Sequence, residues 1–100
     1  MTKGLFVDRA ALEMLCRRHC IRRLSLFGSV LKGTARPDSD VDLLVEFEPD
    51  ATPSYFGMAA IEGELSEMLG GRRVDLRTVR ELSHRFREDI QRAAEVQFAA

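Results

Sequence analysis

The chain has no tryptophan, one tyrosine, two cysteines and three prolines. Two cysteines are too few for the disulfide framework of a small secreted domain. Cys16 and Cys20 lie four residues apart in one helical pattern, so both would project from one helix face and remain reduced. With His19 they resemble a fragment of a zinc site, but no second pair of such ligands follows. We therefore expect packed thiols and a partly exposed histidine.

The chain also lacks a large excess of positive or negative charge, and it lacks long apolar runs. The net charge is −1, which predicts no strong general binding of nucleic acid. No segment reaches the roughly 18 apolar residues of a membrane-spanning helix, and Asp8, Arg9 and Glu13 stand where a secretory signal would be apolar. Hydrophobic residues at 45% and charged residues at 31% are typical of a soluble globular protein. We expect one domain, residues 1–100, in the cytoplasm and without membrane contact.

Hydrophobic periodicity predicts an alternation of helices and strands. Helices are expected at residues 9–19, 58–69 and from about residue 83, with Asp8 as the first N-cap and Gly70 and Gly71 ending the second. Strands are expected at residues 21–27, 41–47 and 73–78, and the tail 95–98 adds a short edge strand. This order predicts an α/β (α+β) fold, a small mixed β-sheet with helices packed on one face. The other face of the sheet would then be free to carry a functional site.

Aromatic residues and methionines are expected in the interior. Tyr55 and Phe56 would anchor the second long helix to the core, and Phe86 would lie on the inner side of the last helix with Ile90 and Ala94. The methionines at helical spacing are expected to fill the core.

Acidic residues occupy alternate positions where the strand 41–47 begins. Side chains alternate along a strand, so Asp40 and Asp42 point to the same face, with Cα atoms about 6.6 Å apart. Two carboxylates about 8 Å apart repel by about 2 kcal/mol in an effective dielectric of about 20. Asp75 lies on the face of the strand 73–78 opposite Val74 and Leu76, so it can supply a third carboxylate. Magnesium prefers oxygen ligands, and three carboxylates fit two such ions about 3.5–4 Å apart.

The residues before this strand suit an anionic ligand. Gly28 allows close approach of the backbone, Ser29 offers a hydroxyl and an amide at the start of a helical turn, and Lys32 adds positive charge. Residues 33–39 read as a loop because Gly33, Pro37 and Asp38 are turn formers. The stretch therefore predicts a phosphate cradle, a loop and a metal-binding strand.

The charged residues around the three aspartates have a simpler interpretation. Arg73 and Arg77 flank Asp75 on its own face and are expected to form ordinary solvated ion pairs. The alternative is that they steady phosphate or orient Asp75. Glu46 shares the face of Asp42 farther along the strand and is expected to pair with an arginine at the surface.

The combination of "GS", a spacer, "DVD" and the later "RRVDLRT" resembles the minimal nucleotidyltransferase family of the DNA polymerase β superfamily. The likeness covers nearly the whole chain, including "MLGGRRVDL" and "LSHRFREDIQRAAEV". It implies a minimal polymerase-β-like palm, transfer of a nucleoside monophosphate from a nucleoside triphosphate, and magnesium as cofactor. By this resemblance Gly28 and Ser29 hold the triphosphate, while Asp40, Asp42 and Asp75 bind the metal ions.

One short segment departs from the family pattern. Members commonly show Ala and Arg where this chain has Leu31 and Lys32. Lysine keeps the positive charge but lacks the bidentate fork of arginine, which would change the grip on the triphosphate.

Minimal members of this family are similar to antitoxins whose partner is a HEPN-domain ribonuclease toxin. The resemblance implies transfer of AMP from ATP to a tyrosine of that toxin. A second hypothesis is a binding antitoxin that covers its toxin without catalysis, and a third is nucleotide transfer to RNA or a small molecule. Assembly with the toxin or with further copies of this chain stays open.

Overall fold

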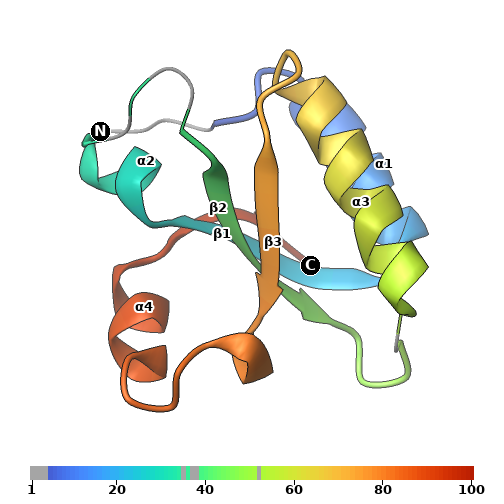
Figure 1. Ribbon diagram of the computed structural model, residues 1–100. Coiled ribbons are helices and arrows are strands. Elements are labelled where there is room, and N and C mark those ends of the chain that lie inside the picture. Colours follow the sequence, from blue (N-terminus) through green and yellow to red (C-terminus); the bar gives the residue numbers. More distant parts are fainter. Residues whose placement is uncertain (1–4, 35, 37–38, 52) are drawn as a thin grey trace.

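The computed structural model describes residues 5–34, 36, 39–51 and 53–100, and its centre is a four-stranded sheet in the order β3-β2-β1-β4 (Figure 1). The elements follow one another as α1 (Arg9–Arg18), β1 (Ile21–Phe27), α2 (Ser29–Lys32), β2 (Val41–Phe47), α3 (Tyr55–Met68), β3 (Val74–Thr78), the 3-10 helix η1 (Val79–Glu81), α4 (Arg87–Ala93) and β4 (Glu95–Ala99). β1 pairs antiparallel with β2 and β4, and β2 pairs parallel with β3. The predicted mixed sheet and its fourth edge strand are confirmed.

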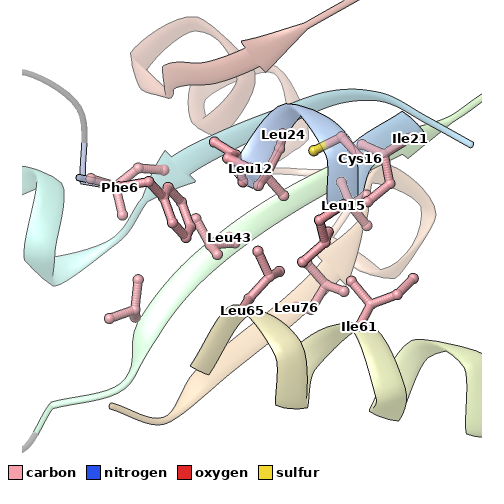
Figure 2. Close-up of a cluster of buried hydrophobic side chains, with 13 residues drawn as sticks. Phe6, Leu12, Leu15, Cys16, Ile21, Leu24, Leu43, Ile61, Leu65 and Leu76 are labelled. Carbon is pink, nitrogen blue, oxygen red and sulfur yellow. The ribbon is translucent and has the colours of Figure 1, made fainter. Parts of the chain in front are cut away.

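The two long helices α1 and α3 cover one face of the sheet, and the hydrophobic core lies between them and the strands (Figures 1 and 2). β2 contributes three fully buried side chains at alternate positions, Val41, Leu43 and Val45. Leu15 of α1 and Leu65 of α3 pack into the same cluster. Because successive side chains of a strand point to opposite faces, these three residues of β2 all point inward.

The long helices begin and end where their sequence signals predict. The Asp8 side chain accepts a hydrogen bond from the Ala11 amide at 3.0 Å, and Ser54 accepts one from the Gly57 amide at 3.1 Å. Glu64 of α3 joins the two helices, since it accepts a hydrogen bond from Arg18 and lies 2.6 Å from His19 Nε2. These contacts fix α3 against α1, and therefore fix the chain that leads from α3 into β3.

The second face of the sheet is less open than the sequence predicts. In Figure 1, α2 and α4 lie on the side of the sheet opposite α1 and α3. Leu44, which shares the side of Asp42, is also buried. β2 is a central strand that also contacts α2 and η1, and these contacts help to shield the residues of β2 that point to this face.

Several predicted core aromatics are exposed, and those predictions were wrong. Tyr55 and Phe56 are 85% and 82% exposed because they occupy the first turn of α3, before Met58 makes its first contact with the core. Phe86 is 54% exposed because a turn at Ser83 delays α4 until Arg87, which leaves Phe86 at the N-cap.

The cysteines and methionines were predicted to be packed in the interior, and only some of them are. Cys16 is buried and Cys20 is exposed, and both are free thiols, so only Cys16 is packed as predicted. Cys20 follows the end of α1 with φ +57°, which turns it away from the helix face. Met58 and Met68 pack against the core, but Met14 is exposed on α1. Among the described residues, no helix combines the length and the apolar character needed to cross a membrane.

Candidate active site

The turn after β1 brings a backbone glycine against a carboxylate. Gly28 has φ +80° and ψ −154°, a conformation that only glycine adopts without strain. A Cβ atom placed on Gly28 would lie 2.1 Å from Oδ2 of Asp42, far inside van der Waals contact. The sequence predicted that Gly28 allows close approach of an anionic ligand, whereas the anion it approaches in the structure is a side chain of the same chain.

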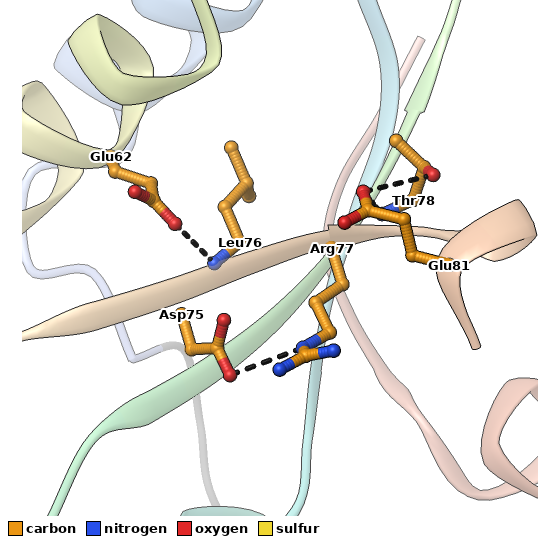
Figure 3. Close-up of polar contacts among 6 residues, drawn as sticks. All are labelled: Glu62, Asp75, Leu76, Arg77, Thr78 and Glu81. Atoms are coloured by element: carbon orange, nitrogen blue, oxygen red, sulfur yellow. Dashed lines mark hydrogen bonds and ion pairs between the residues drawn. The ribbon is translucent and has the colours of Figure 1, made fainter. Parts of the chain in front are cut away.

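Strand register brings two of the three predicted aspartates together. Asp42 of β2 is paired in register with Asp75 of β3, and on its other side it is paired with Phe27, the residue before Gly28. Asp75 is one-third exposed and projects from β3 opposite Leu76, which enters the core (Figure 3). Asp40 lies just before β2 and is more exposed than Asp42. The carboxylates of Asp42 and Asp75 therefore lie beside the glycine corner, outside the hydrophobic interior.

The electrostatic state of Asp42 reflects this crowding. Burial raises the pKa of the Asp42 carboxyl above its ordinary value, and the negative charges of Asp75 and Asp40 raise it further. Arg77 opposes these effects and lowers the pKa. The charged form of Asp42 is thus disfavoured in the fold, and a cation placed beside it would relieve that cost.

Two arginines, Arg73 just before β3 and Arg77 within it, form ion pairs with the other two aspartates. Arg77 Nε donates to Asp75 Oδ2 at 3.2 Å (Figure 3), and Arg73 Nε lies 3.8 Å from Asp40 Oδ1. These are the solvated ion pairs that the sequence predicted, although their partners are the candidate site residues themselves. Glu46 likewise pairs with Arg23 at 3.8 Å, as expected for a surface residue.

The donor chemistry of the three aspartates fits magnesium, which favours carboxylate oxygens. Within the described residues, however, no group of three acidic, histidine or cysteine side chains converges closely enough to hold a metal ion. Asp40 and Asp75 are each paired with an arginine, Arg73 and Arg77 respectively.

The predicted phosphate-binding residues form a short, well-closed turn. Ser29 is the first residue of α2, and the Lys32 amide donates to the Gly28 carbonyl at 3.1 Å. Gly33, at φ +75°, ends the helix, and the Thr34 amide donates back to the Ser29 carbonyl at 3.0 Å. The Lys32 side chain is exposed to solvent. The loop residue Asp38 lies outside the described residues.

A pocket of about 970 Å³ opens beside Asp75, and the sequence did not predict it. Its lining combines the start of α3, the end of β2, β3 and η1, and it includes Tyr55 and Arg77. Hydrophobic periodicity does not predict that Tyr55 and Phe56 are exposed. Their position could have predicted it, because both follow the N-cap Ser54 directly, where the helix has not yet reached the core.

Comparison with known proteins agrees with the fold. A family model described as the nucleotidyltransferase domain matches residues 9–96. The chain is similar to protein adenylyltransferase MntA of Thermococcus cleftensis, with 45% identity over 62 residues. Those residues are 62% of this chain and 60% of that protein, so the match spans less than two thirds of the relative.

Two solved structures share the arrangement of helices and strands. One is a protein assigned as a minimal nucleotidyltransferase, with a TM-score of 0.70, 44% identity, and coverage of 86% of this chain and 85% of that chain. The other comes from a complex of a tri-AMPylated Shewanella oneidensis HEPN toxin with an MNT antitoxin. It has a TM-score of 0.64, 18% identity, and coverage of 94% of this chain and 71% of that chain, so it shows the fold alone.

Proposed function

Because the chain belongs to the nucleotidyltransferase domain family, we propose that it transfers AMP from ATP to a tyrosine hydroxyl of a partner HEPN-domain toxin. In this proposal the chain acts as the antitoxin of a toxin–antitoxin pair. The observation that carries the proposal is the placement of Asp42 between Gly28 and Asp75, with Asp40 two residues before it. That placement joins a phosphate-binding turn to a set of metal-ligating carboxylates.

The relatives support the choice of nucleotide and partner. The similar protein from Thermococcus cleftensis is named an adenylyltransferase acting on protein, which favours AMP as the transferred group. A chain with the same fold occurs in a complex with an AMPylated HEPN toxin, which favours a HEPN partner. The net charge of −1 fits a protein acceptor better than RNA.

Each site residue has a defined role in the proposed reaction. Gly28 and Ser29 hold the triphosphate at the start of α2, with Lys32 adding positive charge nearby. Asp40, Asp42 and Asp75 are the residues that would hold two magnesium ions. Bound magnesium would neutralise the charge of the phosphates and of the attacking oxygen. Arg73 and Arg77 partly neutralise the same carboxylates without the ions.

The reaction is an in-line displacement at the α-phosphorus. The tyrosine oxygen forms a bond to this phosphorus, and the bond from the phosphorus to the oxygen bridging to the β-phosphate breaks. Pyrophosphate leaves, and the hydroxyl proton passes to a base, for which Asp75 is the carboxylate at the acceptor side. The product is an AMP ester of the tyrosine.

The test compares wild-type protein with Asp42→Asn after incubation with ATP, magnesium and the product of the neighbouring gene. We expect the wild type to add one or more AMP groups to the partner, measured by intact mass. Loss of one central carboxylate should slow this transfer about 1,000-fold, or about 4 kcal/mol, because charge stabilisation dominates such displacements.

The alternative is an antitoxin that neutralises its partner by binding alone. Leu31 and Lys32, which stand where family members commonly have Ala and Arg, favour this second function because they would change the grip on the triphosphate. If an Asp40→Ala/Asp42→Ala variant rescues cells from the toxin as well as the wild type does, and no AMP is added by either protein, the enzymatic proposal is wrong and the binding function holds.

A further inference from the structure

The pocket beside Asp75 lies on one side of the proposed active site only. The described residues that line it include Asp75 but not Gly28, Ser29, Asp40 or Asp42. Asp75 is also the in-register partner of Asp42, so it stands at the border between the glycine corner and the pocket. In an in-line displacement the attacking and leaving oxygens lie on opposite sides of the phosphorus. If the triphosphate occupies the glycine corner, the acceptor approaches from the pocket.

The rim of the pocket carries an exposed aromatic pair. The rings of Tyr55 and Phe56 have centroids 6.0 Å apart and meet edge to face at 86°. Both rings are more than four-fifths exposed, and Tyr55 lines the pocket directly. Two large rings held in water at the mouth of a pocket are typical of a protein-binding surface, because aromatic side chains contribute much of the energy of such interfaces.

The charges of the pocket indicate the class of acceptor. Its lining carries Arg77 and Arg80, and Arg77 is paired with Asp75. Against these stand the carboxylates of Glu46, Glu48, Glu62 and Glu81, in addition to Asp75. An excess of negative charge repels the phosphate backbone of RNA and is compatible with a polypeptide. The volume of about 970 Å³ exceeds what one tyrosine side chain needs, so several residues of an acceptor segment fit.

We propose that this pocket is the docking site for the polypeptide segment that carries the acceptor hydroxyl, with the Tyr55–Phe56 pair as its apolar anchor. The proposal rests on the proposed function in that the acceptor is a protein and reacts beside Asp75. Docking itself is independent of catalysis, so binding and transfer can be measured separately. Contacts at Tyr55 and Phe56 would hold the segment while its hydroxyl reaches Asp75.

The test uses the full chain with the paired substitution Tyr55→Ser/Phe56→Ser. The matched control is Val7→Ser/Met14→Ser, which removes two exposed apolar side chains outside the pocket lining. Affinity for the product of the neighbouring gene is measured by calorimetry without nucleotide, and affinity for ATP with magnesium is measured separately. The paired variant should bind the partner about 30-fold or more weakly, since the loss of a central anchor costs that much. The control variant and the Tyr55→Phe variant should bind like the wild type.

Steady-state transfer gives the second measurement. The paired variant should raise the KM for the protein acceptor and leave kcat within about twofold of the wild type. An unchanged partner affinity, or an equal loss in the control variant, would overturn the docking proposal. Weaker binding of ATP by the paired variant would also overturn it, because the pocket would then belong to the nucleotide. Ring-dependent binding without any AMP transfer would support the docking site and count against the proposed function alone.

Discussion

Leu43 and Asp42 are neighbours in the sequence, yet they face opposite kinds of environment. Leu43 is fully buried between the sheet and the long helices, where every contact stabilises the fold. Asp42 lies beside two other carboxylates and a glycine that leaves it almost no room, and its own burial raises its pKa. One strand thus stabilises the protein on one face and accumulates unfavourable charge on the other. Such local cost is characteristic of functional sites.

The largest expected effect tests the stabilising face. Leu43→Ala removes a buried side chain and leaves a cavity, so the free energy of unfolding should fall by about 2–5 kcal/mol. Urea unfolding followed by circular dichroism measures this change, and Leu43→Val serves as a milder variant. If Asp42→Asn lowered the stability by the same amount, the contrast between the two faces of β2 would be wrong.

The next effect tests the close contact that shapes the charged face. Gly28→Ala places a methyl group on Asp42 and forces a conformation that alanine rarely adopts, so stability should fall by about 1–3 kcal/mol. Gly63→Ala is the matched control, because Gly63 lies in α3 with open space around its Cα. Alanine there should raise stability by about 0.5–1 kcal/mol. Equal effects of the two substitutions would show that the Asp42 contact does not matter.

The smallest effect concerns the charge of Asp42 itself. Its pKa is raised above the ordinary value of 3.8, so the unfolded chain gives up this proton at a lower pH than the folded chain does. The folded state therefore loses stability as the pH rises from about this ordinary value through the raised pKa, and the loss stays constant above it. Solvent screening at this partly exposed site keeps this effect smaller than the two above.

The measurement is the melting temperature of wild-type protein and Asp42→Asn across pH, without divalent metal. At neutral pH the variant should melt at a higher temperature than the wild type, and this difference should shrink as the pH falls and Asp42 becomes protonated. A variant that melts lower than the wild type at neutral pH would contradict the raised pKa.

Much of the fold follows from the sequence where the signals are long and regular. The bounds of β1 and β2 match the prediction because each is a run rich in apolar strand formers with turn-forming residues nearby, such as Gly28 after β1 and Pro49 beyond β2. α2 was predicted only as a helical turn and η1 was not predicted, since three or four residues show no period. Tyr55 and Phe56 were misplaced because hydrophobicity alone does not tell where a helix first meets the core.

The sequence predicted which residues belong to the candidate site, but it did not predict all of the contacts that they make. The alternation along β2 and β3 placed Asp42 and Asp75 on one side, and the strand register brings them together. The partners of the carboxylates depend on side-chain directions across strands. The spacing of two residues along the strand predicted Arg77 beside Asp75, but no local pattern showed that Gly28 would press against Asp42.

The outer edge of β3 carries two hydrogen bonds with a wider consequence (Figure 3). The Leu76 amide donates to Glu62 Oε2 at 2.8 Å, and the Thr78 amide donates to Glu81 Oε1 at 3.0 Å. A foreign strand adding to this edge would have to displace both carboxylates and face their negative charge. These two carboxylates therefore disfavour the addition of a strand from another molecule at the β3 edge of the sheet. A partner that docks in the pocket would approach this same edge.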